Sequence, residues 1–195
     1  MVDSIFQKLE YEAFRAGVPA RTTQSRAWFQ KKIKLMGDIN RQTLLKDPAL
    51  IKKQRFGPGN MYMFFYDPKH KKTLPYYDAF PLTIMVDRAP GGFYGLNLHY
   101  VAPPLRAKLM DALMDTATNK RFDENTKFKI NYGILNSASK MAAFKPCFKH
   151  YLTKHVDSSI AMVESPEWEI AVFMPTQQFR KARASKVWAD SKGMI

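Results

Sequence analysis

The chain has 195 residues and a mass of 22.5 kDa, and 46% of its residues are hydrophobic, so it can bury a core and is not disordered as a whole. Lysine and arginine outnumber aspartate and glutamate by 31 to 17, and the net charge of +14 favours polyanionic partners, nucleic acid first. No apolar run approaches the roughly 20 residues that cross a bilayer, and the single cysteine excludes an internal disulfide. We expect no leader peptide, no membrane contact and a reducing compartment.

The first 56 residues form the basic end of the chain. They hold 12 lysines and arginines against 5 acidic residues, which is half of the net charge. Apolar residues at helical spacing predict one helix over 5–14 and a second over 25–36, capped by Thr22 or Thr23.

Four basic side chains on the second predicted helix are candidates to lie along a phosphate backbone. They are Arg26, Lys31, Lys32 and Lys34. The alternative is that they form an ordinary solvated helix face.

A β-rich core is predicted after Gly57. Strands are expected over 61–66, 82–87 and 93–100, and the residues at 89–92 form a turn because proline fixes φ and glycine permits positive φ. Three successive antiparallel strands predict a meander or an SH3-like open barrel.

The second half of the chain is predicted to alternate between helices and strands. A helix over 103–115 covers the sheet, and further helices are expected over 137–144 and 148–156. Alternating apolar residues over 158–164 and 168–174 predict a hairpin.

Together these elements predict an α+β fold with a small antiparallel β core and covering helices. We divide the chain into a basic helical region at 1–56, an α+β core at 57–175 and a basic C-terminal arm at 176–195. Such an arm orders against a partner or is a mobile terminus. Its candidate nucleic-acid contacts are Arg180, Lys181 and Arg183.

The segment at 67–78 combines charge, prolines and aromatic rings. Lysines neutralise phosphates and tyrosines stack on exposed bases, which is suited to holding a duplex terminus. The candidates are Lys69, Lys71, Lys72, Tyr76 and Tyr77. The alternative is a loop stiffened by its prolines, with both tyrosines packed on the core.

The sequence carries no familiar catalytic motif. His150 and His155 are five residues apart and do not form a helical metal pair. A nuclease-like centre would need Asp67, Asp78 and Asp87, and turn-forming aspartates explain these more simply. We therefore predict no enzyme, no catalytic residues, no metal and no cofactor, and no small-molecule substrate.

Several runs in the middle of the chain carry a resemblance to a known family. They are Met61–Asp78, Phe80–Leu82, Gly92–Tyr100 and Pro103–Leu109. In these runs the chain resembles virion proteins of T-even-type contractile-tailed bacteriophages, of the DNA end protector or head-completion type.

The resemblance implies a non-catalytic virion protein that binds the ends of the packaged double-stranded DNA and shields them from exonuclease. It implies a location in the virion, and in the cytoplasm of the bacterial host during assembly. A related alternative is a structural baseplate or neck subunit that contacts other virion proteins and no DNA. The resemblance carries no residue-level binding motif.

Overall fold

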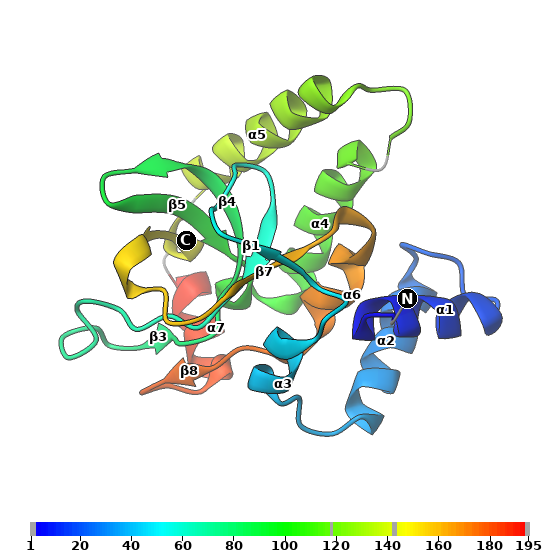
Figure 1. The fold of residues 1–195 in the computed structure, drawn as a ribbon, viewed down its shortest axis with the longest axis horizontal. Coiled ribbons are helices and arrows are strands. Elements are labelled where there is room, and N and C mark those ends of the chain that lie inside the picture. The colour runs from blue at the N-terminus through cyan, green and yellow to red at the C-terminus, as the bar shows by residue number, and fades with distance from the viewer. Residues whose placement is uncertain (1–2, 118, 142–143, 194–195) are drawn as a thin grey trace.

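The computed structural model describes residues 3–117, 119–141 and 144–193, and Figure 1 shows their arrangement. These residues form seven α-helices, a six-stranded antiparallel sheet and a two-stranded one. The helices are α1 (Ile5–Arg15), α2 (Thr23–Leu35), α3 (Arg41–Lys46), α4 (Pro103–Ala117), α5 (Glu124–Lys140), α6 (Trp168–Phe173) and α7 (Ala184–Gly193). The strands are β1 (Ile51–Lys53), β2 (Met61–Met63), β3 (Tyr77–Asp78), β4 (Leu82–Ala89), β5 (Gly92–Asn97), β6 (Phe148–Leu152), β7 (Ile160–Val163) and β8 (Phe179–Arg180). The predicted α+β class is confirmed.

The main sheet has the strand order β1-β7-β2-β4-β5-β6 and is open, with β1 and β6 at its edges. β2, β4, β5 and β6 follow one another as antiparallel neighbours, which matches the predicted meander rather than a barrel. The pair β3 and β8 forms the separate small sheet. None of the described helices has the length and apolar character that a membrane crossing requires.

Both long N-terminal helices begin at reciprocal side-chain caps. The Ser4 hydroxyl accepts a bond from the Gln7 backbone N–H at 3.1 Å, and the Gln7 side chain accepts one from Ser4 N–H at 2.9 Å. Thr22 and Ser25 make the same exchange at the start of α2. Such local signals fix a helix start, and the two predicted helices and the Thr22 cap are confirmed.

The N-terminal helices are held to the rest of the fold by two glutamates near and on α6. The Ser4 hydroxyl donates to Glu167 at 2.9 Å, and the Ser25 hydroxyl donates to Glu169 at 2.5 Å. Burial raises the pKa of the Glu167 carboxyl, and the Ser4 hydrogen bond opposes that rise only in part.

Successive side chains of β2 point to opposite faces of the sheet and so contribute to two apolar layers. Met61 and Met63 face the main core beneath the helices, whereas Tyr62 and the following Phe64 face an aromatic cluster on the other side of the sheet. The strand predicted over 61–66 is shorter than expected, because the chain leaves the ladder after β2 and pairs again only at an isolated bridge from Tyr66.

The hairpin between β4 and β5 confirms the predicted turn. Its two-residue loop is Pro90 and Gly91, and Gly91 has a φ of 71°. Gly92 has no space for a side chain, because a Cβ there would lie 1.8 Å from the carbonyl oxygen of Tyr151. β5 ends at Asn97 and continues as a 3₁₀ turn, so the strand predicted over 93–100 is also shorter.

Two predictions in the second half are wrong. The segment 148–156, predicted as a helix, is strand β6 followed by a 3₁₀ turn, because its pairing with β5 overrides an apolar spacing that mimics a helix. The segment 168–174, predicted as a strand, contains α6, five of whose six residues are buried, so no polar face reveals its period.

The helix predicted over 103–115 is confirmed as α4. The one predicted over 137–144 corresponds at 137–140 to the end of α5, while residues 142–143 lie outside the described residues.

The C-terminal segment is packed on the core. β8 pairs with β3, Val187 of α7 is fully buried, and the indole N–H of Trp188 donates to the carbonyl oxygen of His99 at 2.8 Å. The described part of this basic segment is therefore ordered by the chain itself. The domain boundaries predicted at 56 and 175 stay predictions.

Candidate nucleic-acid interface

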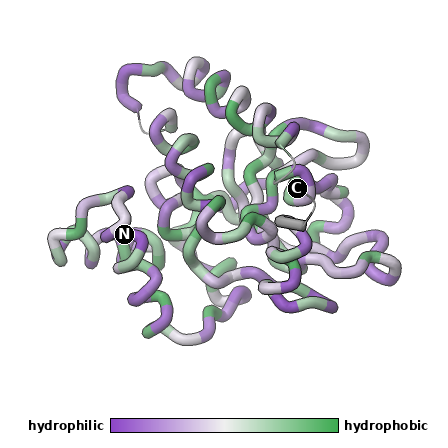
Figure 2. The backbone as a smooth tube through the Cα atoms, turned by 180° about the vertical axis from the view of Figure 1, so that it is seen from behind, coloured by the Kyte–Doolittle hydropathy of each residue, from purple (hydrophilic) through white to green (hydrophobic). Residues whose placement is uncertain are grey.

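The structure brings together two segments that the sequence analysis singled out separately. In β3 and β8, Tyr77 lies opposite Arg180 and Asp78 opposite Phe179. The loop 67–78 and the segment 179–183 therefore form one continuous area, which we call the loop–tail surface. Figure 2 shows this loop as largely hydrophilic.

Lys181 fixes the loop to the tail. Its Nζ donates to the carbonyl oxygens of Lys71, Lys72 and Leu74 at 2.6, 3.0 and 2.9 Å. The Lys181 backbone is left-handed, with a φ of 68°, which is uncommon for a residue with a side chain. Within the loop, Lys71 forms an ion pair with Asp67 at 2.7 Å, and this hydrogen bond raises the pKa of Lys71.

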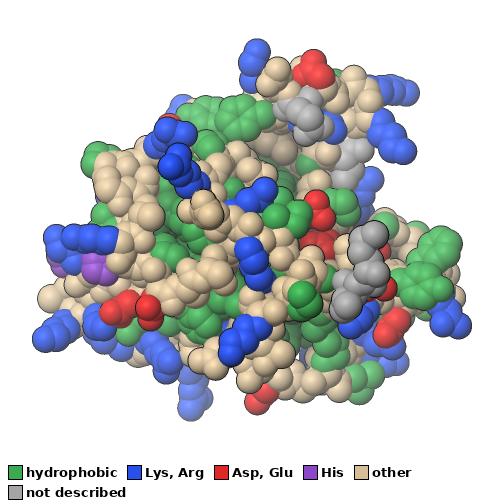
Figure 3. Space-filling model, viewed as in Figure 1, with side chains coloured by type: hydrophobic (Ala, Val, Ile, Leu, Met, Phe, Trp, Pro, Cys, Tyr) green, Lys and Arg blue, Asp and Glu red, His purple; other side chains and the backbone are tan. Residues whose placement is uncertain are grey.

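Several basic side chains of the loop–tail surface are exposed and form no ion pair among the described residues. They are Lys69, Lys72, Arg180 and Arg183. In Figure 3, blue side chains follow the lower left edge of the molecule, where Figure 1 places β3 and β8. The surface therefore offers uncompensated positive charge.

Asp78 lies beneath this surface and is 4% exposed. Its carboxylate accepts hydrogen bonds from the backbone of Phe80 and Gln178 at 3.1 and 2.9 Å, and from Asn97 at 3.2 Å. A fourth contact of 2.6 Å joins it to Nδ1 of His99. Burial disfavours the charged carboxylate, but His99 and the backbone donors outweigh it, so the pKa of Asp78 lies below its ordinary value.

His99 completes this buried network. Burial lowers its pKa and outweighs the attraction of Asp78, so the neutral ring donates from Nδ1 and accepts from the Thr176 hydroxyl at Nε2, 3.2 Å away. Arg106 donates to backbone carbonyl oxygens of His99 and Val101, and burial lowers its pKa to about 10. The network ties β3, β5 and the tail together.

The carboxylates considered for a nuclease-like centre do not converge. Asp78 is buried in the network, Asp67 is paired with Lys71, and Asp87 is exposed on β4. In the part of the chain that the structure describes, no three histidine, cysteine or acidic residues are grouped as metal ligands.

A pocket of about 470 Å³ opens between the loop and β6. Its walls include Tyr66, Tyr76, Tyr77 and Tyr100, and lysines and histidines from both sides line it. The ammonium group of Lys149 lies 4.0 Å from the centre of the Tyr100 ring. The predicted alternative for the tyrosines is partly correct, since Tyr76 packs against the core, and both half-buried tyrosines line this pocket.

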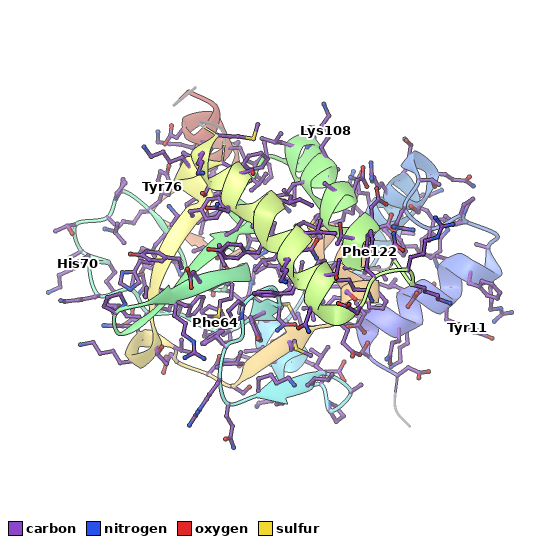
Figure 4. The ribbon with its side chains drawn as sticks, turned by 90° about the horizontal axis from the view of Figure 1, so that it is seen from above. Tyr11, Phe64, His70, Tyr76, Lys108 and Phe122 are labelled. Carbon is purple, nitrogen blue, oxygen red and sulfur yellow. The ribbon has the colours of Figure 1, made fainter. Side chains whose placement is uncertain are left out.

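The basic residues of α2 lie elsewhere. Arg26 forms an ion pair with Asp111 of α4, and Lys32 forms one with Glu12 at 2.6 Å. Lys31 and Lys34 are exposed and form no ion pair with any described residue. Figure 4 places Tyr11, on the neighbouring α1, and His70, in the loop, at opposite ends of the molecule. The structure therefore does not join α2 to the loop–tail surface.

Sequence reasoning considered Asp78 only for a nuclease-like centre and missed both its contact with His99 and the position of Lys149. Asp78 and His99 are 21 residues apart, and no local pattern relates them. Lys149 lies in the segment predicted as a helix, and its position in the aromatic run from Phe148 to Tyr151 is the signal that marks it as a phosphate-binding candidate.

A sequence profile of the family described as "Phage T4 terminal DNA protecting protein" matches residues 1–191. No curated protein and no solved structure was found to match. The profile covers almost the entire chain, including every residue of the loop–tail surface, and it confirms the resemblance to a T-even phage virion protein. The chain belongs to the family of phage terminal DNA protecting proteins.

Proposed function

We propose that this protein binds the ends of the packaged double-stranded DNA without catalysis and shields them from exonuclease through the loop–tail surface. The family match supports the role in DNA end protection. The four unpaired basic side chains of the surface supply the means, because cations that neutralise phosphates release counterions and so drive binding.

The observation that carries the proposal is the contact of Lys181 with three carbonyl oxygens. It holds a tyrosine-bearing loop against a basic tail without neutralising either segment. Rigid placement of rings beside free cations reduces the ordering cost of binding a duplex terminus. We place the interface here rather than on α2, where carboxylates neutralise Arg26 and Lys32.

The test is protection of linear duplex DNA from a processive exonuclease, titrated with the full chain and challenged with closed-circular DNA of the same sequence. Protection that survives an excess of the circular competitor is the expected result. Protection that the competitor abolishes would show general basic binding and overturn end recognition. Complete absence of protection would favour the structural baseplate or neck subunit.

Salt provides a second readout. If the four unpaired side chains contact phosphates, the affinity falls roughly tenfold when the salt concentration doubles, since each contact adds about 0.9 to the logarithmic slope. A slope near zero would contradict phosphate binding by this surface.

A further inference from the structure

The pocket beside the loop–tail surface is too small for a duplex and suited to one nucleotide. Its volume is about 470 Å³, within the range of roughly 300–1,000 Å³ typical of sites that enclose a small ligand. One wall is the loop and the opposite wall is β6, so the pocket opens beside the basic side chains of the surface.

The aromatic lining is held in place by packing and hydrogen bonds. Tyr100 packs edge-on against Phe179 with ring centres 5.2 Å apart, and Tyr76 lies 6.1 Å from Tyr100. The Tyr66 hydroxyl accepts the backbone N–H of Leu152 at 3.0 Å. A base that enters therefore meets ring surfaces that need no further ordering, and stacking on them is independent of the base's identity.

The charge of the pocket favours an anion. Its described lining contains one carboxylate, Asp78, and that group is committed to four hydrogen bonds beneath the surface. Lys69 and Lys149 contribute positive charge from opposite walls.

Lys149 is the clearest sign of a missing partner. Burial lowers the pKa of its ammonium group, and within the described residues no carboxylate forms an ion pair with it. The charge faces the Tyr100 ring and lies near the Cys147 thiol, whose pKa burial raises to about 11, so neither neighbour is an anion at neutral pH. A phosphate at this place would compensate a half-buried cation that no carboxylate among the described residues pairs with.

We propose that this pocket receives the unpaired terminal nucleotide of a DNA end, with its base on the tyrosine wall and its phosphate at Lys149 and Lys69. The inference rests on the proposed function and extends it to the source of end selectivity. A terminal base pair lacks a neighbour on one side and opens more readily than an internal pair, whose extrusion costs a few kcal/mol. Closed-circular DNA offers no such nucleotide.

The experiment compares the affinity of the full chain for duplexes that differ only at the terminal pair. One has a mismatched terminal pair, which is already open, and the other has a terminal pair closed by an interstrand crosslink. We expect the open terminus to bind roughly tenfold more tightly, because the protein no longer supplies the cost of opening it. Closed-circular DNA is the reference for binding away from ends.

Two variants test whether the pocket is responsible for the preference for open termini. Lys149→Met keeps the side-chain stem and removes the charge, and Tyr76→Leu removes a ring from the wall. Both are expected to reduce the tenfold preference to less than twofold, while Lys154→Met and Tyr11→Leu, which lie outside the pocket, keep it. Addition of deoxyadenosine monophosphate should shift amide resonances in β6 of the wild-type chain and not of Lys149→Met.

The outcomes separate the two proposals. Equal affinity for open and crosslinked termini, with preference for either over circular DNA, would overturn the nucleotide pocket and leave end binding intact. Equal affinity for linear and circular DNA would overturn the proposed function itself. A preference for open termini that Lys149→Met and Tyr76→Leu both retain would show that another part of the chain reads the terminus.

Discussion

Two basic regions of this protein differ in the partners of the cations that attach them to the fold. On α2, Arg26 and Lys32 are paired with Asp111 and Glu12, so the helix is attached through charges that cancel. On the loop–tail surface, Lys181 is held by three carbonyl oxygens. A carbonyl accepts a hydrogen bond without carrying a full negative charge, so this region is fixed in place while its positive charge is retained.

Backbone carbonyl oxygens also hold a basic side chain where the tail begins. Arg41 of α3 donates to the carbonyl oxygens of Thr176 and Gln177, both at 2.7 Å. A count of lysines and arginines therefore does not locate a polyanion site. What matters is whether their structural partners are carboxylates or backbone.

The largest expected effect is on DNA binding. Replacing Lys72 and Arg180 by glutamine should weaken binding to linear duplex roughly 50-fold at about 0.1 M salt, because two phosphate contacts are lost. The matched double variant with glutamine at Lys31 and Lys34 removes the same charge from α2 and should cost less than about threefold. Equilibrium binding at fixed salt measures both, and equal losses would erase the distinction between the two regions.

Local signals made the N-terminal half of the fold predictable. The caps at Ser4 and Thr22 and the turn at Pro90–Gly91 depend on neighbours within a few residues, and the sequence displays them directly. The strand nature of 148–152 depends on pairing with β5, more than 50 residues away. No local spacing could reveal it.

The residues of the candidate site could be predicted from the sequence, but their arrangement in space could not. The lysines and tyrosines of the loop and the basic residues of the tail could be named from the sequence. The loop and the tail come together through the pairing of β3 with β8, about 100 residues apart in the sequence. The neutralisation of Arg26 likewise depends on Asp111, 85 residues away, and so could not be foreseen.

The loop–tail surface and the attachment of the N-terminal helices should respond oppositely to acid. The pKa of His99, beneath the loop–tail surface, is lowered by burial, so between pH 6.5 and its folded value the unfolded chain binds more protons. Its stabilising contribution is complete above pH 6.5 and is lost as the pH falls, with a slope of up to about 1.4 kcal/mol per pH unit.

Two carboxyl groups at the attachment of the N-terminal helices, Glu10 on α1 and Glu167 before α6, give a pH dependence of the opposite sign. Burial raises the pKa values of Glu10 and Glu167, so their contribution to stability is complete below about pH 4.5 and is lost as the pH rises through the folded values.

Urea unfolding from pH 7 to pH 5 measures how the free energy of unfolding changes with pH because of His99. The His99→Gln variant should flatten this slope, and His150→Gln, at an exposed site on β6, should retain it. An unchanged slope in His99→Gln would contradict the assignment.

Removal of the Lys181 ammonium group should loosen the loop. Lys181→Met is expected to lower the free energy of unfolding by about 1 kcal/mol, since hydrogen bonds to a charged but solvent-exposed group are lost. Amide hydrogen exchange at residues 71–74 should accelerate, whereas Lys72→Met, in the same loop, should leave it unchanged. If exchange stays slow in Lys181→Met, the prolines and the ladder between β3 and β8 are sufficient to hold the loop.

Removing the carboxylate of α4 that pairs with α2 should change the affinity for DNA least. Asp111→Asn frees the charge of Arg26 and should raise the affinity for linear duplex by at most about threefold, at a stability cost of up to about 1 kcal/mol for a partly exposed ion pair. A gain of tenfold or more would show that α2 binds DNA once its cations are released. The same binding titration gives the answer.

The open sheet has a consequence for the behaviour of many copies together. Its edge strands are β1, which is three residues long and carries the exposed Lys52 and Lys53, and β6, which carries Lys149 and His150. A strand from a second copy that paired with either edge would have to bring like charges together and remove them from water. The basic surplus of this chain thus also opposes edge-to-edge pairing between copies.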